Sequence, residues 1–260
     1  PINVVQPSMI VGIHGLENKP PVDEKTRWWK AAIVEGLSRN CEYSGADIPF
    51  AFVYWADLRY ETPIAGDAND EPYRPEEGTG PFPSHAPEAE ASLNDGLIGK
   101  VYRGLAAVQE ATGVTPIDDA ILERRFDDLW HYHSETPFAQ QVRRRLIDVL
   151  ASMVGQRVLL VAHSMGSIIA YDALRMLERE APLVRVEHFV TLGSPLGMAE
   201  VRLKIASENG SVRVPNNVGR WTNIADSRDL AAVAGTLAAE FAPNDHGSQI
   251  KDMAVLNAYV

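Results

Sequence analysis

The stretch LLVAHSMGSIIAYDAL at residues 159–174 decides the fold class of this chain. It begins as an apolar run, passes through the residues HSMG, and continues with apolar residues at helical spacing. This pattern predicts a buried strand that turns directly into a helix. Ala162 and Gly166 lie two residues before and two residues after Ser164. Small residues at both places let a strand and a helix approach closely, and they would also hold Ser164 out at the turn as a nucleophile.

Other apolar and β-branched runs alternate with helical patterns along the chain. Strands are expected at residues 8–14, 48–55, 156–161, 184–192 and 220–225, and helices at about 23–37, 136–153 and 165–180, with Asp23 as N-cap of the first helix. This alternation predicts an α/β fold with a mostly parallel central sheet and helices on both faces.

A proline-rich stretch interrupts this regular pattern. Asp57–Glu90 contains six prolines, three glycines, nine acidic residues and two arginines. Prolines remove backbone donors and fix φ, so regular structure is not expected there. A chain of 260 residues is long enough for one large α/β domain. We expect a single domain over residues 1–260, with residues 58–130 as a lid-like or cap-like insertion.

Composition excludes several classes of partner and site. The formal net charge is −11, from 24 basic and 35 acidic residues, which disfavours nucleic acid as a partner. Cys41 is the only cysteine, so an intramolecular disulfide and a zinc-finger pattern are excluded. No apolar run approaches the roughly 18 residues of a membrane span. The first residues lack the pattern of a signal peptide, so the cytoplasm is the default expectation.

Nucleophilic chemistry at Ser164 would need hydrogen-bond donors for a developing oxyanion. The first residue of the following helix, Met165, offers one backbone N–H. The motif IHGL at residues 13–16 follows an early strand and offers a second one. Gly15 would let the chain turn so that the Leu16 N–H points into the site. The alternative is that Gly15 serves only to end the strand, and together with Ser164 the first interpretation is favoured.

A catalytic serine also needs a base and an acid that orients it. The motif RWTNIADSRDLAA at residues 220–232 places Asp226 and Asp229 just past a strand. Asp226 would also suit a turn or a helix N-cap. His246, in PNDHGSQ, is the only histidine that follows both acids.

In this order, the motifs resemble the α/β-hydrolase superfamily on its lipase and esterase side. The matching stretches are IHGLENKP, VYWADL, LLVAHSMGSIIAYDAL, VTLGSPLG, RWTNIADSRDLAA and NDHGSQI. They cover most of the chain except about residues 58–135. The resemblance is specific for the superfamily and says little about the substrate.

The resemblance implies a role for each matching residue. Ser164 would be the nucleophile, His246 the base, and Leu16 and Met165 the oxyanion donors. Lipase-like sequences often carry N-x-x-D-x-x-D-P-V after the acid strand, which favours Asp229. This chain has Leu and Ala in place of Pro and Val. Asp226 therefore stays as the alternative acid.

The function expected from these features is hydrolysis of a small-molecule carboxylic ester through an acyl-enzyme, without a metal or an organic cofactor. An acyltransferase or a thioesterase would use the same residues. A different class of function is a catalytically inactive protein of this fold that binds a ligand. Asp128 and His131 have i, i+3 spacing in FDDLWHYH, but two ligands are too few to predict a metal site.

Overall fold

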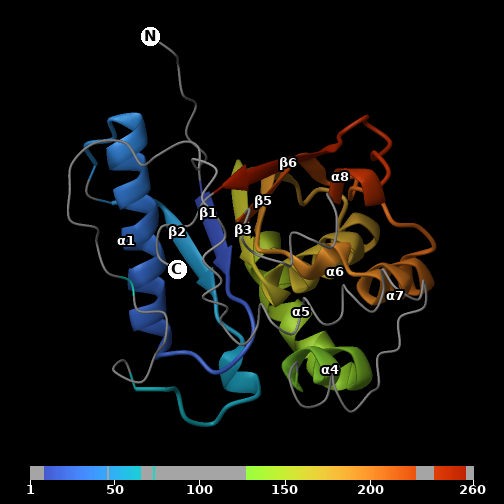
Figure 1. Cartoon of the computed structure of the whole chain (residues 1–260), viewed down its shortest axis with the longest axis horizontal. Helices are drawn as coiled ribbons and strands as arrows, with labels where there is room; N and C mark the ends of the chain where they lie inside the picture. The colour runs from blue at the N-terminus through green and yellow to red at the C-terminus, as the bar shows by residue number, and fades with distance from the viewer. Residues whose placement is uncertain (1–8, 46, 66–72, 74–126, 227–236, 256–260) are drawn as a thin grey trace, which may run out of the picture.

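The computed structural model describes residues 9–45, 47–65, 73, 127–226 and 237–255. The described residues form one six-stranded sheet in the order β2-β1-β3-β4-β5-β6, and every pair of neighbours runs parallel (Figure 1). Because all strands share one direction, their carboxyl ends meet at a single edge of the sheet. We call it the carboxyl edge, and the opposite one the amino edge.

Five of these strands confirm the predicted ones. The strands are β1 (Met9–Ile13), β2 (Phe50–Val53), β3 (Val158–His163), β4 (Val186–Leu192), β5 (Val218–Asp226) and β6 (Ile250–Val255). The sixth, β6, was not predicted, because Lys251 and Asp252 interrupt its apolar run. It lies next to β5 at one side of the described sheet.

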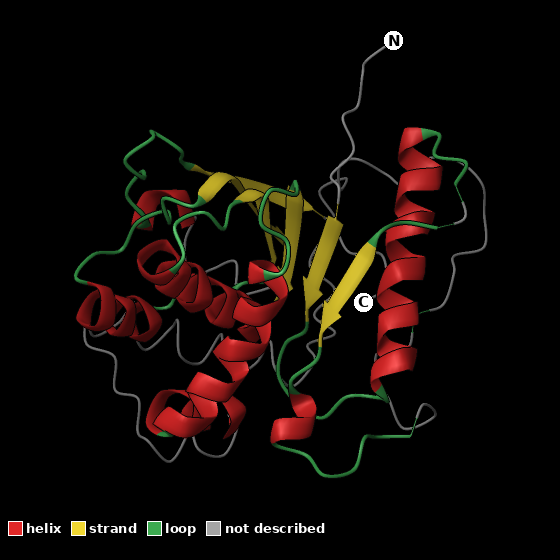
Figure 2. Cartoon of the chain, turned by 180° about the vertical axis from the view of Figure 1, so that it is seen from behind, coloured by secondary structure: helices red, strands yellow, loops and turns green. Residues whose placement is uncertain are grey.

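The described helices lie on both faces of the sheet, as the alternating pattern predicts. The long helix α1 (Val22–Cys41) stands on one face, and α5 (Thr136–Ala151) and α6 (Met165–Glu180) cover the other (Figure 2). The shorter elements are η1 (Ala56–Leu58), α4 (Asp127–Ser134), η3 (Pro195–Gly197), α7 (Ala199–Asn209) and α8 (Leu237–Glu240). A proline in the first turn of α5 suits its start, because the proline ring fixes φ at a helical value.

The hydrophobic core lies mainly between the sheet and the pair α5 and α6. On β3, Leu160 and Ala162 are fully buried, whereas Val161 and His163 on the other face are half-buried. Burying one leucine side chain contributes about 2 kcal/mol. On β3, the face toward α5 and α6 is therefore completely covered, and the face toward α1 is only partly covered.

Helix α1 makes few close contacts with the sheet. Trp29 packs over Gly12 of β1, where an added Cβ would lie 2.9 Å from the Trp29 ring. The helix begins after Pro21, which takes the N-cap position, so the prediction of Asp23 as N-cap is wrong. Among the residues of α1, Lys25 is the buried one.

Most of the expected insertion at 58–130 lies outside the described residues. The parts that are described are 58–65, residue 73 and 127–130, and the last of these belongs to α4.

Candidate active site

Ser164 lies at the carboxyl edge, between the last residue of β3 and the first residue of α6. Its backbone has φ 52° and ψ −130°. A residue with a side chain rarely adopts this conformation, which costs about 1–3 kcal/mol and is concentrated at functional sites. The strand-to-helix turn predicted from the sequence is present, and it holds Ser164 in a strained backbone.

Hydrogen bonds from neighbouring elements hold this turn. The Ser164 N–H donates to the Leu192 carbonyl oxygen of β4 at 2.9 Å. The Ser164 carbonyl accepts from the backbone N–H of Ser167 at 2.9 Å and from its hydroxyl at 2.6 Å. The Ser167 hydroxyl is also 2.7 Å from the Ser194 hydroxyl. These contacts fix the main chain on both sides of Ser164.

The small residues around Ser164 are required by crowding. A Cβ on Gly166 would lie 2.5 Å from the His14 carbonyl oxygen and 2.8 Å from the Ile13 carbonyl oxygen. A Cβ on Gly15 would lie 2.6 Å from the Ser164 Cβ. The segment of residues 14–17 therefore packs directly against Ser164, and we call it the HGLE loop.

The sequence predicts two backbone N–H groups as oxyanion donors. They belong to Leu16 in the HGLE loop and to Met165 at the start of α6, where the first N–H groups of a helix have no partner within it. Among the described residues we find no hydrogen bond from either N–H. The side chains of both residues are buried.

The structure places a histidine that the sequence analysis did not single out, His14, in the loop that packs against Ser164. Its Nε2 accepts a hydrogen bond from the backbone N–H of Trp55 at 3.0 Å. The ring proton therefore lies on Nδ1, which donates to the Gly15 carbonyl oxygen at 2.9 Å. A peptide unit is planar, so holding the Gly15 carbonyl also fixes the direction of the Leu16 N–H. The pair His14-Gly15 at a strand end is the sequence signal for this arrangement.

His14 is held in its neutral form. Its side chain is 1 % exposed, and burial lowers its pKa well below the ordinary value, against the opposing effect of the Gly15 hydrogen bond. The charges of Lys19 and Lys25 lower this pKa further. Since both ring nitrogens are hydrogen-bonded, His14 orients the HGLE loop and is not placed to take a proton from Ser164.

The structure does not bring His246 to Ser164. His246 precedes β6, which runs parallel to β5, so His246 lies near the amino edge. The strand register places Met253 of β6 level with His163. At about 3.3 Å per residue, His246 is therefore at least about 10 Å away along the strands, and at about 4.8 Å per strand it is also about 14 Å away across them.

The PNDHGSQ motif has a structural explanation in place of the expected catalytic one. The buried side chain of Asn244 donates to the carbonyl oxygens of Pro215 and Val218, each at 3.1 Å. Its Oδ1 accepts from the N–H groups of His246 and Ser248. The motif is thus a turn that connects to the start of β5, and the prediction that His246 is the base at Ser164 is corrected.

The predicted acids are placed only in part. Asp226 is the last residue of β5 and so lies at the carboxyl edge, as Ser164 does. Asp229 lies outside the described residues. The choice between the two acids stays a prediction.

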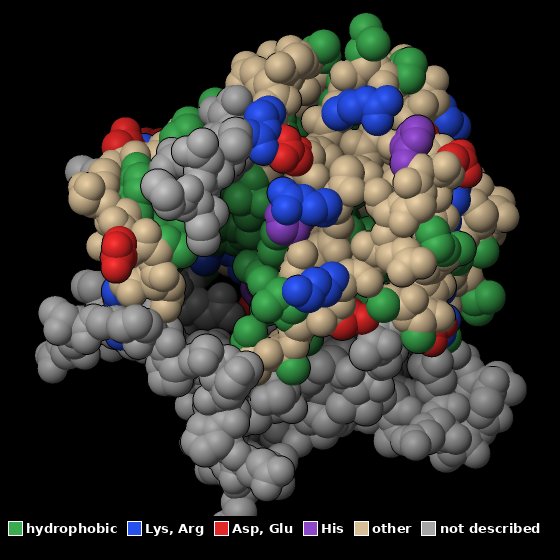
Figure 3. Space-filling view, turned by 90° about the horizontal axis from the view of Figure 1, so that it is seen from above, with side chains coloured by type: hydrophobic (Ala, Val, Ile, Leu, Met, Phe, Trp, Pro, Cys, Tyr) green, Lys and Arg blue, Asp and Glu red, His purple; other side chains and the backbone are tan. Residues whose placement is uncertain are grey.

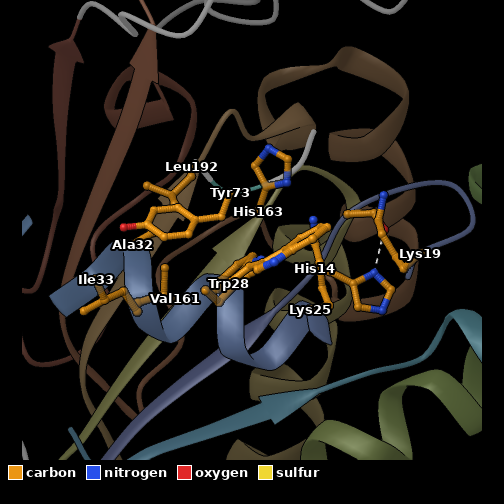
Figure 4. A pocket seen from close by; sticks show the side chains of 12 residues that line it. His14, Lys19, Lys25, Trp28, Ala32, Ile33, Tyr73, Val161, His163 and Leu192 are labelled. Carbon is orange, nitrogen blue, oxygen red and sulfur yellow. Dashed lines mark hydrogen bonds between the residues drawn. The ribbon is translucent and has the colours of Figure 1, made fainter. Parts of the chain in front are cut away.

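A pocket lies between α1 and the half-buried face of β3 (Figure 4), and its lining includes Gly15 and His163, which adjoin Ser164. Its volume is about 390 Å³. Its lining residues are His14, Gly15, Lys19, Lys25, Trp28, Trp29, Ala32, Ile33, Tyr73, Val161, His163 and Leu192. Seen from the amino edge, hydrophobic side chains also line a hollow on the α1 side of the molecule (Figure 3). The pocket is mostly apolar, with the lysines toward the HGLE loop.

The pair Asp128 and His131, considered above for a metal, does not form a common site. The Asp128 carboxylate accepts from the Glu17 N–H and the Tyr60 hydroxyl. His131 lies between Asp127 of the same helix and Glu135, the N-cap residue of α5. Among the residues that the structure describes, no group of three or more His, Cys, Asp or Glu side chains could hold a metal ion. No helix in the described ranges is long and apolar enough to span a membrane.

Comparison with known proteins gives a family match over part of the chain. A family model described as lecithin:cholesterol acyltransferase matches residues 125–210, which are 86 of the 260 residues. The matched stretch runs from α4 to the end of α7 and includes β3, Ser164, α6 and β4. No curated protein matches the chain. Together with the all-parallel sheet and its flanking helices, this match shows that the chain has an α/β-hydrolase fold.

Proposed function

We propose that this protein is a serine hydrolase that cleaves carboxylic esters with an apolar acyl group, with Ser164 as nucleophile. The observation that carries the proposal is the strained Ser164 at the start of α6, with the HGLE loop packed against it. The similarity of residues 125–210 to the lecithin:cholesterol acyltransferase family supports acyl chemistry on a lipid ester.

In the proposed reaction, the Ser164 Oγ attacks the ester carbonyl carbon and gives its proton to a histidine. The bond to the alcohol oxygen then breaks, and the alcohol leaves with that proton. Water attacks the resulting acyl-enzyme by the same route and releases the carboxylic acid. The strained turn serves this step because it fixes the main chain on both sides of the nucleophile.

The oxyanion of each tetrahedral intermediate would accept hydrogen bonds from the N–H groups of Leu16 and Met165. Both groups belong to rigid backbone, one in the loop held by His14 and one at the start of α6. Donors that are already oriented need no rearrangement during the reaction, and a single one contributes a factor of about 10²–10³ to the rate.

The acyl group would occupy the pocket between α1 and β3. Most of its lining side chains are apolar, including Trp28, Ile33, Val161 and Leu192. Its volume of about 390 Å³ lies within the range of small-ligand sites. Burial of the acyl group against these side chains would supply most of the binding free energy.

The proposal names candidates for the catalytic acid but no residue for the catalytic base. His246 lies at the amino edge and both nitrogens of His14 are occupied, so we assign the base to neither residue. The acid would be Asp226, the last residue of β5 at the carboxyl edge, or Asp229, three residues further along the sequence.

Reaction with a fluorophosphonate probe tests the nucleophile. We expect the wild type to be labelled at one site and to hydrolyse p-nitrophenyl octanoate. The variant Ser164→Ala should lose labelling and at least about 10³-fold of the hydrolysis rate, because no other group replaces the hydroxyl. Peptide mapping of the labelled protein should locate the probe on Ser164.

The matched control is Ser152→Ala, which removes a hydroxyl at the exposed end of α5 and should leave both measurements unchanged. A wild type that is folded but reacts with neither probe nor ester would contradict the enzymatic proposal and favour a binding protein of this fold. Acyl transfer is the second candidate, because the matching family is described as an acyltransferase. Release of an acyl ester instead of free acid, when an alcohol is added, distinguishes the two.

A further inference from the structure

A buried carboxylate from a distant part of the chain is bonded to the HGLE loop. Asp128 lies in the first turn of α4 and is 2 % exposed. Its Oδ2 accepts from the Glu17 N–H at 2.6 Å, across 111 residues of sequence. Its Oδ1 accepts from the Tyr60 hydroxyl at 2.8 Å, and the Arg59 Nε lies 3.9 Å from the same oxygen. Both carboxylate oxygens are therefore used.

The residue that Asp128 bonds has an unusual backbone. Glu17 has φ 71°, in the left-handed region that residues other than glycine seldom adopt. The hydrogen bond from its N–H to a carboxylate is charge-assisted, and such bonds are about twice as strong as neutral ones. Asp128 thus holds the peptide unit that precedes the left-handed backbone of Glu17.

The two peptide units that meet at the Leu16 Cα are held from different sides. His14 fixes the Gly15 carbonyl, which belongs to the same planar unit as the Leu16 N–H. Asp128 fixes the next unit, which carries the Glu17 N–H. With both units held, the Leu16 N–H has little freedom to rotate.

We propose that Asp128 is a positioning residue for the oxyanion donor Leu16. It does not contact the reacting atoms, and it acts through the Glu17 N–H. This inference rests on the proposed function, because a donor needs positioning only if an oxyanion forms at Ser164.

The neighbouring acid, Asp127, forms exposed ion pairs and serves as a comparison for the buried Asp128. Its side chain is 47 % exposed and pairs with Arg59 and His131. Exposed pairs of this kind contribute about 0–1 kcal/mol. The Asp128 carboxylate is instead buried, at a considerable desolvation cost, and its shortest hydrogen bond comes from the Glu17 N–H.

The experiment compares Asp128→Ala and Asp128→Asn with the wild type. The number of active sites is counted by fluorophosphonate labelling, and the hydrolysis rate is expressed per labelled site. A residue that only stabilises the fold would change the number of sites and leave the rate per site unchanged. We expect Asp128→Ala to lower kcat per site about 30- to 100-fold with KM within about three-fold, since misplacing a catalytic group by about 1 Å costs roughly 10² in rate.

Asp128→Asn keeps an oxygen that can accept from the Glu17 N–H but loses the charge, so we expect an intermediate loss of about three- to ten-fold. Asp127→Asn is the matched control and should react at the wild-type rate per site. If Asp128→Ala reacts at the wild-type rate per site, the inference is wrong. If Asp128→Ala does not fold, a wild-type rate per site in Asp128→Asn overturns the inference instead. Failure of the proposed function would be seen separately, as a wild type that is not labelled at all.

Discussion

At the scale of single residues, the site depends on two glycines whose missing side chains leave space for their neighbours. Gly166 lies against the carbonyl oxygens of Ile13 and His14, and Gly15 lies against Ser164. The pattern around Ser164 predicted that small residues are needed at the strand–helix turn. The contact between Gly15 and Ser164 is different, because it joins segments that are far apart in the sequence.

The variant Gly15→Ala tests this contact. The new Cβ would lie 2.6 Å from the Ser164 Cβ, so the HGLE loop must move away and carry the Leu16 N–H with it. A shift of about 1 Å should lower kcat for p-nitrophenyl octanoate about 10²-fold. Gly36→Ala on α1 is the control, because an added Cβ there meets no atom within 4 Å.

Gly36→Ala should keep full activity and raise the free energy of unfolding by up to about 1 kcal/mol, since alanine favours a helix over glycine. Wild-type kcat in Gly15→Ala would show that the HGLE loop does not determine the rate.

At the scale of elements, the direction of β6 decides what His246 can do. The sequence order of serine, acid and histidine favoured a catalytic role for His246. The structure places β6 after His246 and parallel to β5, so the histidine lies at the start of the strand and far from the carboxyl edge. The side chain of Asn244 builds the turn that makes this connection.

Two variants in this turn should therefore keep their hydrolysis rate, unlike variants of catalytic residues. His246→Ala should hydrolyse p-nitrophenyl octanoate within about two-fold of the wild-type rate. Asn244→Ala should keep its rate per labelled site but lose about 2 kcal/mol of stability, because buried backbone groups lose their partners. Chemical denaturation measures the stability. A folded His246→Ala protein without activity would contradict the strand direction described here.

At the scale of the whole molecule, the buried histidine under the HGLE loop couples stability to pH. Burial lowers the pKa of His14 in the folded protein, whereas in the unfolded chain His14 titrates near pH 6.5. Between these values the unfolded chain binds more protons than the folded protein. The free energy of unfolding should therefore fall as the pH drops below about 6.5, and it should be fully recovered above that value.

The expected slope is at most about 1.4 kcal/mol per pH unit for His14. His133 adds a slope of the same sign, because burial lowers its pKa to about 4. Urea denaturation of the wild type between pH 5 and pH 7.5 measures the total. In His14→Gln the free energy of unfolding should depend less steeply on pH, because the contribution of His14 is removed. Equal slopes in the wild type and in His14→Gln would contradict a neutral, buried His14.

The sequence by itself determined the strand–turn–helix around Ser164, five of the strands, and the α/β class. These features depend on hydrophobic periodicity and residue size over a few neighbours, which can be seen in a short window. Only the tertiary structure decided that His246 lies at the amino edge, that His14 and Asp128 hold the HGLE loop, and that Gly15 contacts Ser164. The physical reason is that strand order, strand direction and contacts across 111 residues follow from burial of the whole sheet, and no local pattern encodes them.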